Sequence, residues 1–236
     1  SVIQPVEKTN FKKVLSIVPG GIKQVILPAY VDNEYILCGD KELPIVQKGK
    51  KYFIYSESYF SNMKEKKCEV NGVKVTFQIV EKLFPFEELK VDSKRVSLSK
   101  KDLERVIKER AILKKAYATK SNKVNLTKNF KLPLDTFVTS HYGKKRMFNN
   151  IKKSQHLGID FRAPVGKEIS AANQGQVVLS MNLFYTGNTV ILYHGVGVFT
   201  VYGHLSKRLV KKGEFVHREQ IVGLAGATGR VTGPHL

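Results

Sequence analysis

Residues 156–160 read His-Leu-Gly-Ile-Asp and set two metal-ligand side chains, His156 and Asp160, four positions apart. In a straight strand four residues span about 13 Å, which is too far for two side chains to share one ion. The chain must therefore bend between them, and Gly158 permits such a bend. A helix would also bring the two side chains together, but Gly158 and the turn signal at 164–166 argue against one. Alone, this spacing is a weak motif.

The histidines strengthen the motif because they are confined to the back of the chain. All six lie at or after position 141: His141, His156, His194, His204, His217 and His235. We therefore expect the chemistry in the back half. His194 follows an apolar run and is expected at a strand end, His217 on a solvated turn, and His141 in a structural role near the site.

Composition describes an ordinary folded chain with a strong positive charge. The 236 residues are 42% hydrophobic and suggest one or two domains. No apolar run approaches the roughly 20 residues that span a bilayer. The net charge of +20 favours polyanions such as nucleic acid, an anionic membrane surface or a cell-wall polymer, although a lysine-rich lineage explains it equally well. Lysines alternate with glutamates, as in 64–67, without a basic stripe, which argues against nucleic acid as a partner.

The front of the chain reads as a β domain over residues 1–95. Apolar and β-branched runs predict strands at 14–18, 24–30, 34–38, 51–55 and 73–80. Asn71-Gly72 between two such runs predicts a tight hairpin. Cys38 and Cys68 have no histidine or CxxC partner, so metal binding is not expected. They form either a disulfide in an oxidising compartment or two buried thiols.

A helix is expected over residues 99–118, with Ser99 as its cap and Asp102 three residues further on. Helix and polar linker together occupy 96–130. From 131 to 236 glycines separate short apolar runs, which predicts an antiparallel sheet domain. The fold class expected is mainly β (α+β), with an N-terminal β domain, a linking helix and a C-terminal β-sheet domain.

Two further motifs accompany the His-Leu-Gly-Ile-Asp stretch. Residues 202–205 read Tyr-Gly-His-Leu, and 228–236 read Thr-Gly-Arg-Val-Thr-Gly-Pro-His-Leu. With Thr139-Ser140-His141-Tyr142-Gly143 upstream, residues 131–236 resemble the LytM/lysostaphin-type zinc metallopeptidases, which cut peptide bonds in bacterial peptidoglycan. The front domain and helix resemble, more loosely, the N-terminal regions of Gram-negative periplasmic members.

This resemblance implies roles for individual residues. His156 and Asp160 are expected to bind zinc (Zn2+), and His204 and His235 to be catalytic. The family's third ligand would follow Leu236, so the domain is expected to be cut short at its C-terminus. The chain opens with Ser1, so the natural start is also expected to be missing, through signal-peptide removal or trimming. The tyrosine that family members often place before the first ligand is absent from 147–155, which leaves Asn149 and Asn150 as candidate substrate-binding residues.

The expected function is zinc-dependent cleavage of peptidoglycan cross-links in the periplasm or cell envelope, most simply by a D,D-endopeptidase, with a carboxypeptidase also possible. Zinc would activate the attacking water, and a histidine would move its proton. One alternative is a catalytically inactive activator of other cell-wall hydrolases, and another is a secreted general protease. The front domain carries no evident chemistry, which suggests intramolecular inhibition of the back domain.

Overall fold

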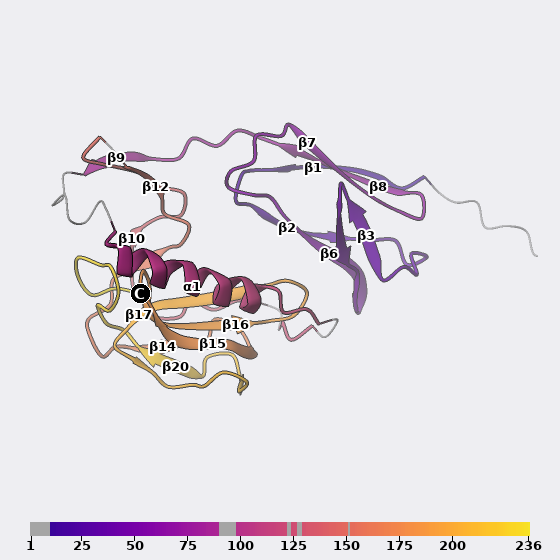
Figure 1. The fold of residues 1–236 in the computed structure, drawn as a ribbon. Helices are drawn as coiled ribbons and strands as arrows, with labels where there is room; N and C mark the ends of the chain where they lie inside the picture. The colour runs from indigo at the N-terminus through magenta and orange to yellow at the C-terminus, as the bar shows by residue number, and fades with distance from the viewer. Residues whose placement is uncertain (1–9, 90–97, 122–123, 127–128, 151) are drawn as a thin grey trace, which may run out of the picture. The chain divides into compact units, whose positions relative to one another are not determined.

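The computed structural model describes residues 10–89, 98–121, 124–126, 129–150 and 152–236 (Figure 1). The chain divides into two compact units, Ser1–Leu83 and Phe84–Leu236. The boundaries expected near 95 and 130 stay predictions, and the first of them falls in 90–97, outside the described residues. Strands dominate both units, which confirms the mainly β fold class. In the part of the chain that the structure describes, no helix is long and apolar enough to cross a membrane.

The described residues of the front unit form two sheets. Their strands are β1 (Lys12–Ile17), β2 (Ile22–Ile26), β3 (Tyr35–Cys38), β4 (Lys41–Pro44), β5 (Val46–Lys48), β6 (Lys50–Ser56), β7 (Glu65–Val70) and β8 (Val73–Ile79). One sheet has the order β1-β8-β7-β3-β4 and the other β2-β6-β5. The run expected at 24–30 forms a strand only as far as Ile26, since Pro28 lacks the amide that a strand needs.

The two front sheets share one hydrophobic core, in which Val25 and Phe53 of the smaller sheet meet Ile36, Val75 and Phe77 of the larger. Strand β8 shows why this sequence forms a half-buried strand, because buried and more exposed side chains alternate along it.

The predicted Asn71-Gly72 hairpin is confirmed. Both residues have positive φ, 43° and 79°, and Val70 pairs with Val73 across the turn. Cys38 lies opposite Cys68 in the β3–β7 pair, and the two form a disulfide, which decides between the alternatives left open by the sequence.

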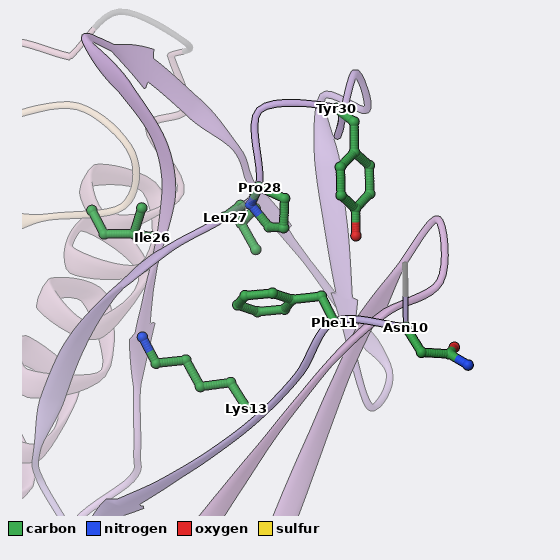
Figure 2. A pocket seen from close by; sticks show the side chains of 7 residues that line it. All are labelled: Asn10, Phe11, Lys13, Ile26, Leu27, Pro28 and Tyr30. Carbon is green, nitrogen blue, oxygen red and sulfur yellow. The ribbon is translucent and has the colours of Figure 1, made fainter. Parts of the chain in front are cut away.

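The front unit also holds an open pocket of about 620 Å³ (Figure 2). Phe11, Leu27 and Pro28 supply much of its apolar wall, and Lys13 is the charged residue among the described residues that line it. The described lining residues include none of the site residues that the sequence predicts.

The back unit contains one helix among its described residues and four sheets. The elements are β9 (Phe86–Leu89), α1 (Lys100–Tyr117), β10 (Val138–Ser140), β11 (Lys145–Phe148), β12 (Lys152–Gln155), β13 (Asp160–Phe161), β14 (Glu168–Ser170), β15 (Gly175–Leu183), β16 (Gly187–Tyr193), β17 (Phe199–Leu205), β18 (Lys207–Arg208), β19 (Phe215–Val216) and β20 (Ile221–Leu224). The sheet orders are β10-β13, β12-β11-β9, β14-β20-β18 and β17-β16-β15-β19.

The β17-β16-β15-β19 sheet is the centre of the back unit because both of its faces are covered. Along β16, Val190 and Leu192 point into one core, whereas Ile191 and Tyr193 point into a second core that includes Ala116 of α1. Helix α1 lies along this sheet (Figure 1). A strand buried on both faces reads as a continuous apolar run, as β16 does.

The predicted helix is confirmed, with Ser99 as its N-cap. The Ser99 hydroxyl accepts a hydrogen bond from the Asp102 amide at 3.1 Å. The buried Glu109 ties the helix to the end of β15, since its carboxylate accepts from the Phe184 amide at 2.8 Å and from Arg105 at 2.7 Å.

Candidate active site

Three strand ends bring His156, Asp160 and His204 to one place in the back unit, where His235 joins them. Asp160 begins β13 and lies opposite Ser140 of β10. His156 directly follows β12, and its amide donates to the Lys144 carbonyl at 2.9 Å. The chain bends between these two residues, as the spacing required.

His235 reaches the same place through the backbone that runs beside β13. It forms bridges with Arg162 on one side and with Gly226 on the other. The neighbouring Leu236 exchanges two backbone hydrogen bonds with Phe161, at 2.8 and 3.1 Å. The end of the described chain is therefore paired to the strand that carries Asp160.

His204 lies near the end of β17 in an uncommon backbone conformation, with φ of 61°. Its amide donates to the Thr186 carbonyl at 2.6 Å, and its Nδ1 lies 2.8 Å from the Thr228 carbonyl. The His204 and His235 rings are 4.6 Å apart between centroids. Strained conformations of this kind are typical of functional sites, where surrounding contacts hold them.

Each of the three site histidines has Nδ1 directed at a backbone carbonyl: Nδ1 of His156 at His141 (3.3 Å), of His204 at Thr228 (2.8 Å) and of His235 at Gly233 (2.9 Å). A carbonyl only accepts hydrogen bonds, so Nδ1 is the protonated nitrogen in each ring. A neutral His204 or His235 ring then has its lone pair on Nε2, whereas Nε2 of His156 faces the Asp160 carboxylate. A ring held in this tautomer by its Nδ1–H bond can bind a metal or accept a proton through Nε2.

The Asp160 carboxylate lies near two of these Nε2 atoms. Its Oδ1 lies 2.9 Å from Nε2 of His156 and 3.8 Å from Nε2 of His235. Burial alone would raise the pKa of the Asp160 carboxyl, but the hydrogen bond and charge of His156, with the charges of His235 and Arg146, lower it overall. Asp160 is accordingly an anion at neutral pH.

The contact between His156 and Asp160 tests whether a metal fits. If Nδ1 of His156 carries the proton, an Nε2 lone pair faces a carboxylate oxygen at 2.9 Å, and two acceptors need a cation between them. Either a second ring proton or a metal ion meets that need. Two ligands about 2.0–2.1 Å from one tetrahedral zinc ion are roughly 3.3 Å apart, so the pair suits the ion. Among the described residues no group of three or more His, Cys, Asp or Glu is arranged to hold a metal. The distance comparison with zinc therefore applies to His156 and Asp160 alone.

The His204 ring has a lowered pKa. Burial is the main cause, and the charges of His235 and His156 act in the same direction, whereas the Thr228 carbonyl and Asp160 oppose it. His204 is therefore neutral at pH 7 and able to accept a proton.

The other candidates lie elsewhere. Asn149 and Asn150 occupy the loop that joins β11 to β12, with φ of 50° and 56°. That loop is at the far end of the hairpin from His156, roughly 15 Å or more along the strands. The structure does not bring these residues to the site, and their contact with substrate stays a prediction. His217 is exposed, as expected.

Sequence reasoning missed the groups that orient the histidines. They are the Ser140 hydroxyl, 3.2 Å from Nδ1 of His156, and the carbonyls of Thr186 and Thr228. Ser140 belongs to the Thr-Ser-His-Tyr-Gly motif, which was a usable signal. A backbone carbonyl carries no signal in residue identity.

Comparison with known proteins identifies the part of the chain that carries these four residues. Residues 154–236 match the family model described as Peptidase family M23, so the chain contains an M23 (LytM-type) peptidase domain. The chain is 45% identical over 100 residues to Peptidoglycan DD-endopeptidase ShyA of Vibrio cholerae, an alignment that covers 42% of this chain and 23% of that relative.

Two further similarities extend this result. The chain is 44% identical over 108 residues to Peptidoglycan DD-endopeptidase ShyC of Vibrio cholerae, which covers 44% of this chain and 24% of the relative. It thus spans about a quarter of the length of these curated relatives. A crystal structure of a Pseudomonas aeruginosa protein assigned to peptidase M23 matches with a TM-score of 0.71 and 27% identity, over 92% of this chain and 86% of the other. That likeness includes much of the front unit as well as the M23 domain.

Proposed function

We propose that this protein is a zinc-dependent endopeptidase that cleaves the peptide cross-links of bacterial peptidoglycan. The observation that carries the proposal is the convergence of His156, Asp160, His204 and His235 on the M23 domain, with Nδ1 of each histidine directed at a carbonyl. The names of the V. cholerae relatives support peptidoglycan as substrate. The net charge of +20 suits an anionic wall.

In this proposal His156 and Asp160 are two of the zinc ligands. Bound zinc supplies a Lewis acid that polarises the scissile carbonyl and lowers the pKa of water. His204 is neutral and offers Nε2, so it accepts the proton of the attacking water and returns it to the leaving amine. His235, 4.6 Å away between ring centroids, orients the reacting groups and shares the proton transfer.

The test is digestion of purified peptidoglycan by the full-length protein, with products separated by chromatography and identified by mass. We expect cross-linked muropeptides to fall to monomers, and chelation to stop the reaction. Asp160→Ala should lose zinc in metal analysis, and the cleavage with it. Cleavage that persists in zinc-free protein would contradict the proposal.

The same assay separates the alternatives. Release of terminal D-alanine without loss of cross-links would indicate a carboxypeptidase, and digestion of casein a general protease. Zinc-free wild-type protein that cleaves nothing, yet stimulates another wall hydrolase, would favour an inactive activator.

We also propose that the protein works in the periplasm or cell envelope. The support is the Cys38–Cys68 disulfide, because disulfides persist in oxidising compartments. Both cysteines are buried in the front core, so the bond closes a 30-residue segment inside a folded unit. Protein isolated without reductant should show no free thiol after denaturation. Two titratable thiols would contradict this placement.

The front unit is proposed to restrain the back one. Its support is that the proposed site residues all belong to the back unit, whereas the front unit has a core of its own. A fragment that begins at Phe84 should then cleave faster than the full-length protein. Equal rates would count against restraint.

A further inference from the structure

A chain of side-chain contacts runs from strand β9 to the proposed zinc ligand His156. Nε of Arg146 donates to Oε1 of Glu87 at 2.8 Å, and an η-nitrogen of Arg146 donates to the Ser140 hydroxyl at 3.2 Å. That hydroxyl lies 3.2 Å from Nδ1 of His156. The network therefore connects a carboxylate in β9 to a ring in the site.

Strand pairing fixes each member of this network. β9 pairs in parallel with β11, and Glu87 lies opposite Arg146. β10 pairs with β13, and Ser140 lies opposite Asp160. The side chains of Glu87 and Arg146 are only 25% and 26% exposed, so this ion pair is better shielded than the surface pairs that contribute little. Lys144 also contacts the Glu87 carboxylate.

The segment before β9 is packed against the same structure. The Lys145 amide donates to the Pro85 carbonyl at 2.8 Å. Gly143 has φ of 87°, and a Cβ there would lie 2.0 Å from Cδ1 of Phe84. The Phe84 ring thus occupies the place of a side chain at 143, and residues 84–87 are held along the strand that leads to Arg146.

The proposed metal binding by His156 explains how this network could act. For Nε2 to offer a lone pair, Nδ1 must keep its proton, which the Ser140 oxygen and the His141 carbonyl accept. Arg146 can only donate hydrogen bonds, so it donates to one lone pair of the Ser140 hydroxyl oxygen. This bond holds the oxygen where its second lone pair can accept the Nδ1 proton of His156. Glu87 in turn fixes the guanidinium.

We propose that Glu87, Arg146 and Ser140 are positioning residues that hold His156 ready for metal binding. Strand β9, which precedes the matched residues 154–236, is then a working part of the site. This inference rests on the proposed function, because it assumes that His156 binds zinc.

The experiment measures zinc affinity of the full-length protein by competition with a chromophoric chelator. We expect Glu87→Gln and Ser140→Ala each to weaken binding by about 10–100-fold, as loss of such partners does. Glu88→Gln is the matched control: it makes the same charge change on the next residue of β9, where the side chain is exposed. Its affinity should equal that of the wild type.

Two further variants separate positioning from charge or general stability. Arg146→Lys keeps the positive charge but loses the fork that spans Glu87 and Ser140, so it should weaken zinc binding as much as Glu87→Gln. The double variant Glu87→Gln/Ser140→Ala should bind zinc as tightly as whichever single variant binds zinc less tightly. The reason is that both residues support His156 through one chain of contacts, so their losses do not add. Rescue by lysine, or additive losses, would overturn the inference.

The outcomes distinguish this inference from the proposal beneath it. Wild-type protein that fails to bind zinc overturns both. Wild-type protein that binds zinc, with Ser140→Ala and Glu87→Gln equal to it, overturns only the positioning role. If Glu87→Gln fails to fold, Ser140→Ala decides the question, because it removes a single hydroxyl.

Discussion

The hairpin of β16 and β17 holds a histidine near each end, and the two ends use the ring differently. At one end His194 is fully buried, with Nδ1 2.7 Å from the Gln174 carbonyl and Nε2 2.8 Å from the Thr200 hydroxyl. At the other end His204 directs Nδ1 at a carbonyl but stands against the His235 ring. Burial lowers the pKa of both rings. A histidine with both nitrogens bound by the fold supports the fold, whereas one that keeps a nitrogen for the site can act on a substrate.

The largest expected effect separates the two histidines by activity. His204→Ala should lower peptidoglycan cleavage by about 10²–10⁴-fold, the usual contribution of a general base, while zinc content stays unchanged. His194→Ala, compared per folded molecule, should cleave at the wild-type rate. A His204→Ala protein that keeps its rate would remove the distinction between the two ends.

Each end of the hairpin also has a glycine, and replacing it tests the backbone that surrounds each histidine. Gly187 has φ of 60°, and a Cβ there would lie 2.3 Å from the carbonyl carbon of Thr228, whose oxygen holds His204. Gly187→Ala should displace that carbonyl and reduce cleavage by about 10²-fold, as misplacement of a catalytic group by about 1 Å does.

The matched control is Gly197→Ala, in the turn near His194. Gly197 has φ of 77°, and a Cβ there meets nothing within 4 Å. This change should cost only the left-handed backbone strain, about 1–2 kcal/mol in the free energy of unfolding, with cleavage unaffected. Equal activity losses in the two variants would show that the Thr228 contact is not what matters.

Mutation of the buried His194 should lower the free energy of unfolding. His194→Ala leaves the Gln174 carbonyl and the Thr200 hydroxyl without their ring partner, which costs about 1–3 kcal/mol for each buried group left unsatisfied. Denaturant unfolding of the full-length protein would measure the loss. A variant as stable as the wild type would mean that water replaces the ring without penalty.

The smallest effect concerns pH. Because the folded-state pKa of His194 is lowered, the unfolded chain takes up the proton first as pH falls through about 6.5. The free energy of unfolding should therefore decrease below that pH, and the decrease ends once the folded ring is protonated too. His194→Gln should show a flatter profile than the wild type between pH 7 and 5. Equal pH dependence in the wild type and His194→Gln would show that a group other than His194 takes up the proton.

Local patterns in the sequence predicted much of the fold. Ser99 and Asp102 indicated the start of the helix, and Asn71-Gly72 indicated a hairpin, because both depend on neighbouring residues. The grouping of His156 with His204 and His235 came from a family resemblance, since no local rule joins residues so far apart.

The features that escaped prediction depend on long-range pairing. The parallel register of β9 with β11 joins segments 59 residues apart, and nothing in 86–89 announces its partner. The partner of Cys38 depended on which strand lies beside β3. Conversely, the strand expected at 24–30 ends at Ile26. The apolar composition of this stretch predicts a longer strand, but Pro28 has no backbone N–H to pair with a neighbouring strand.

The pairing of β9 with β11 also has a consequence for how the protein matures. A parallel pair needs a long crossover, and closing a loop of this length carries an entropy cost that is offset only once the strands pair. Such non-local contacts slow folding. We expect β9 to join the sheet after the local β11–β12 hairpin has formed, so that His156 gains its full set of supporting contacts late. Readiness to take up metal would then mark a back unit that has finished folding.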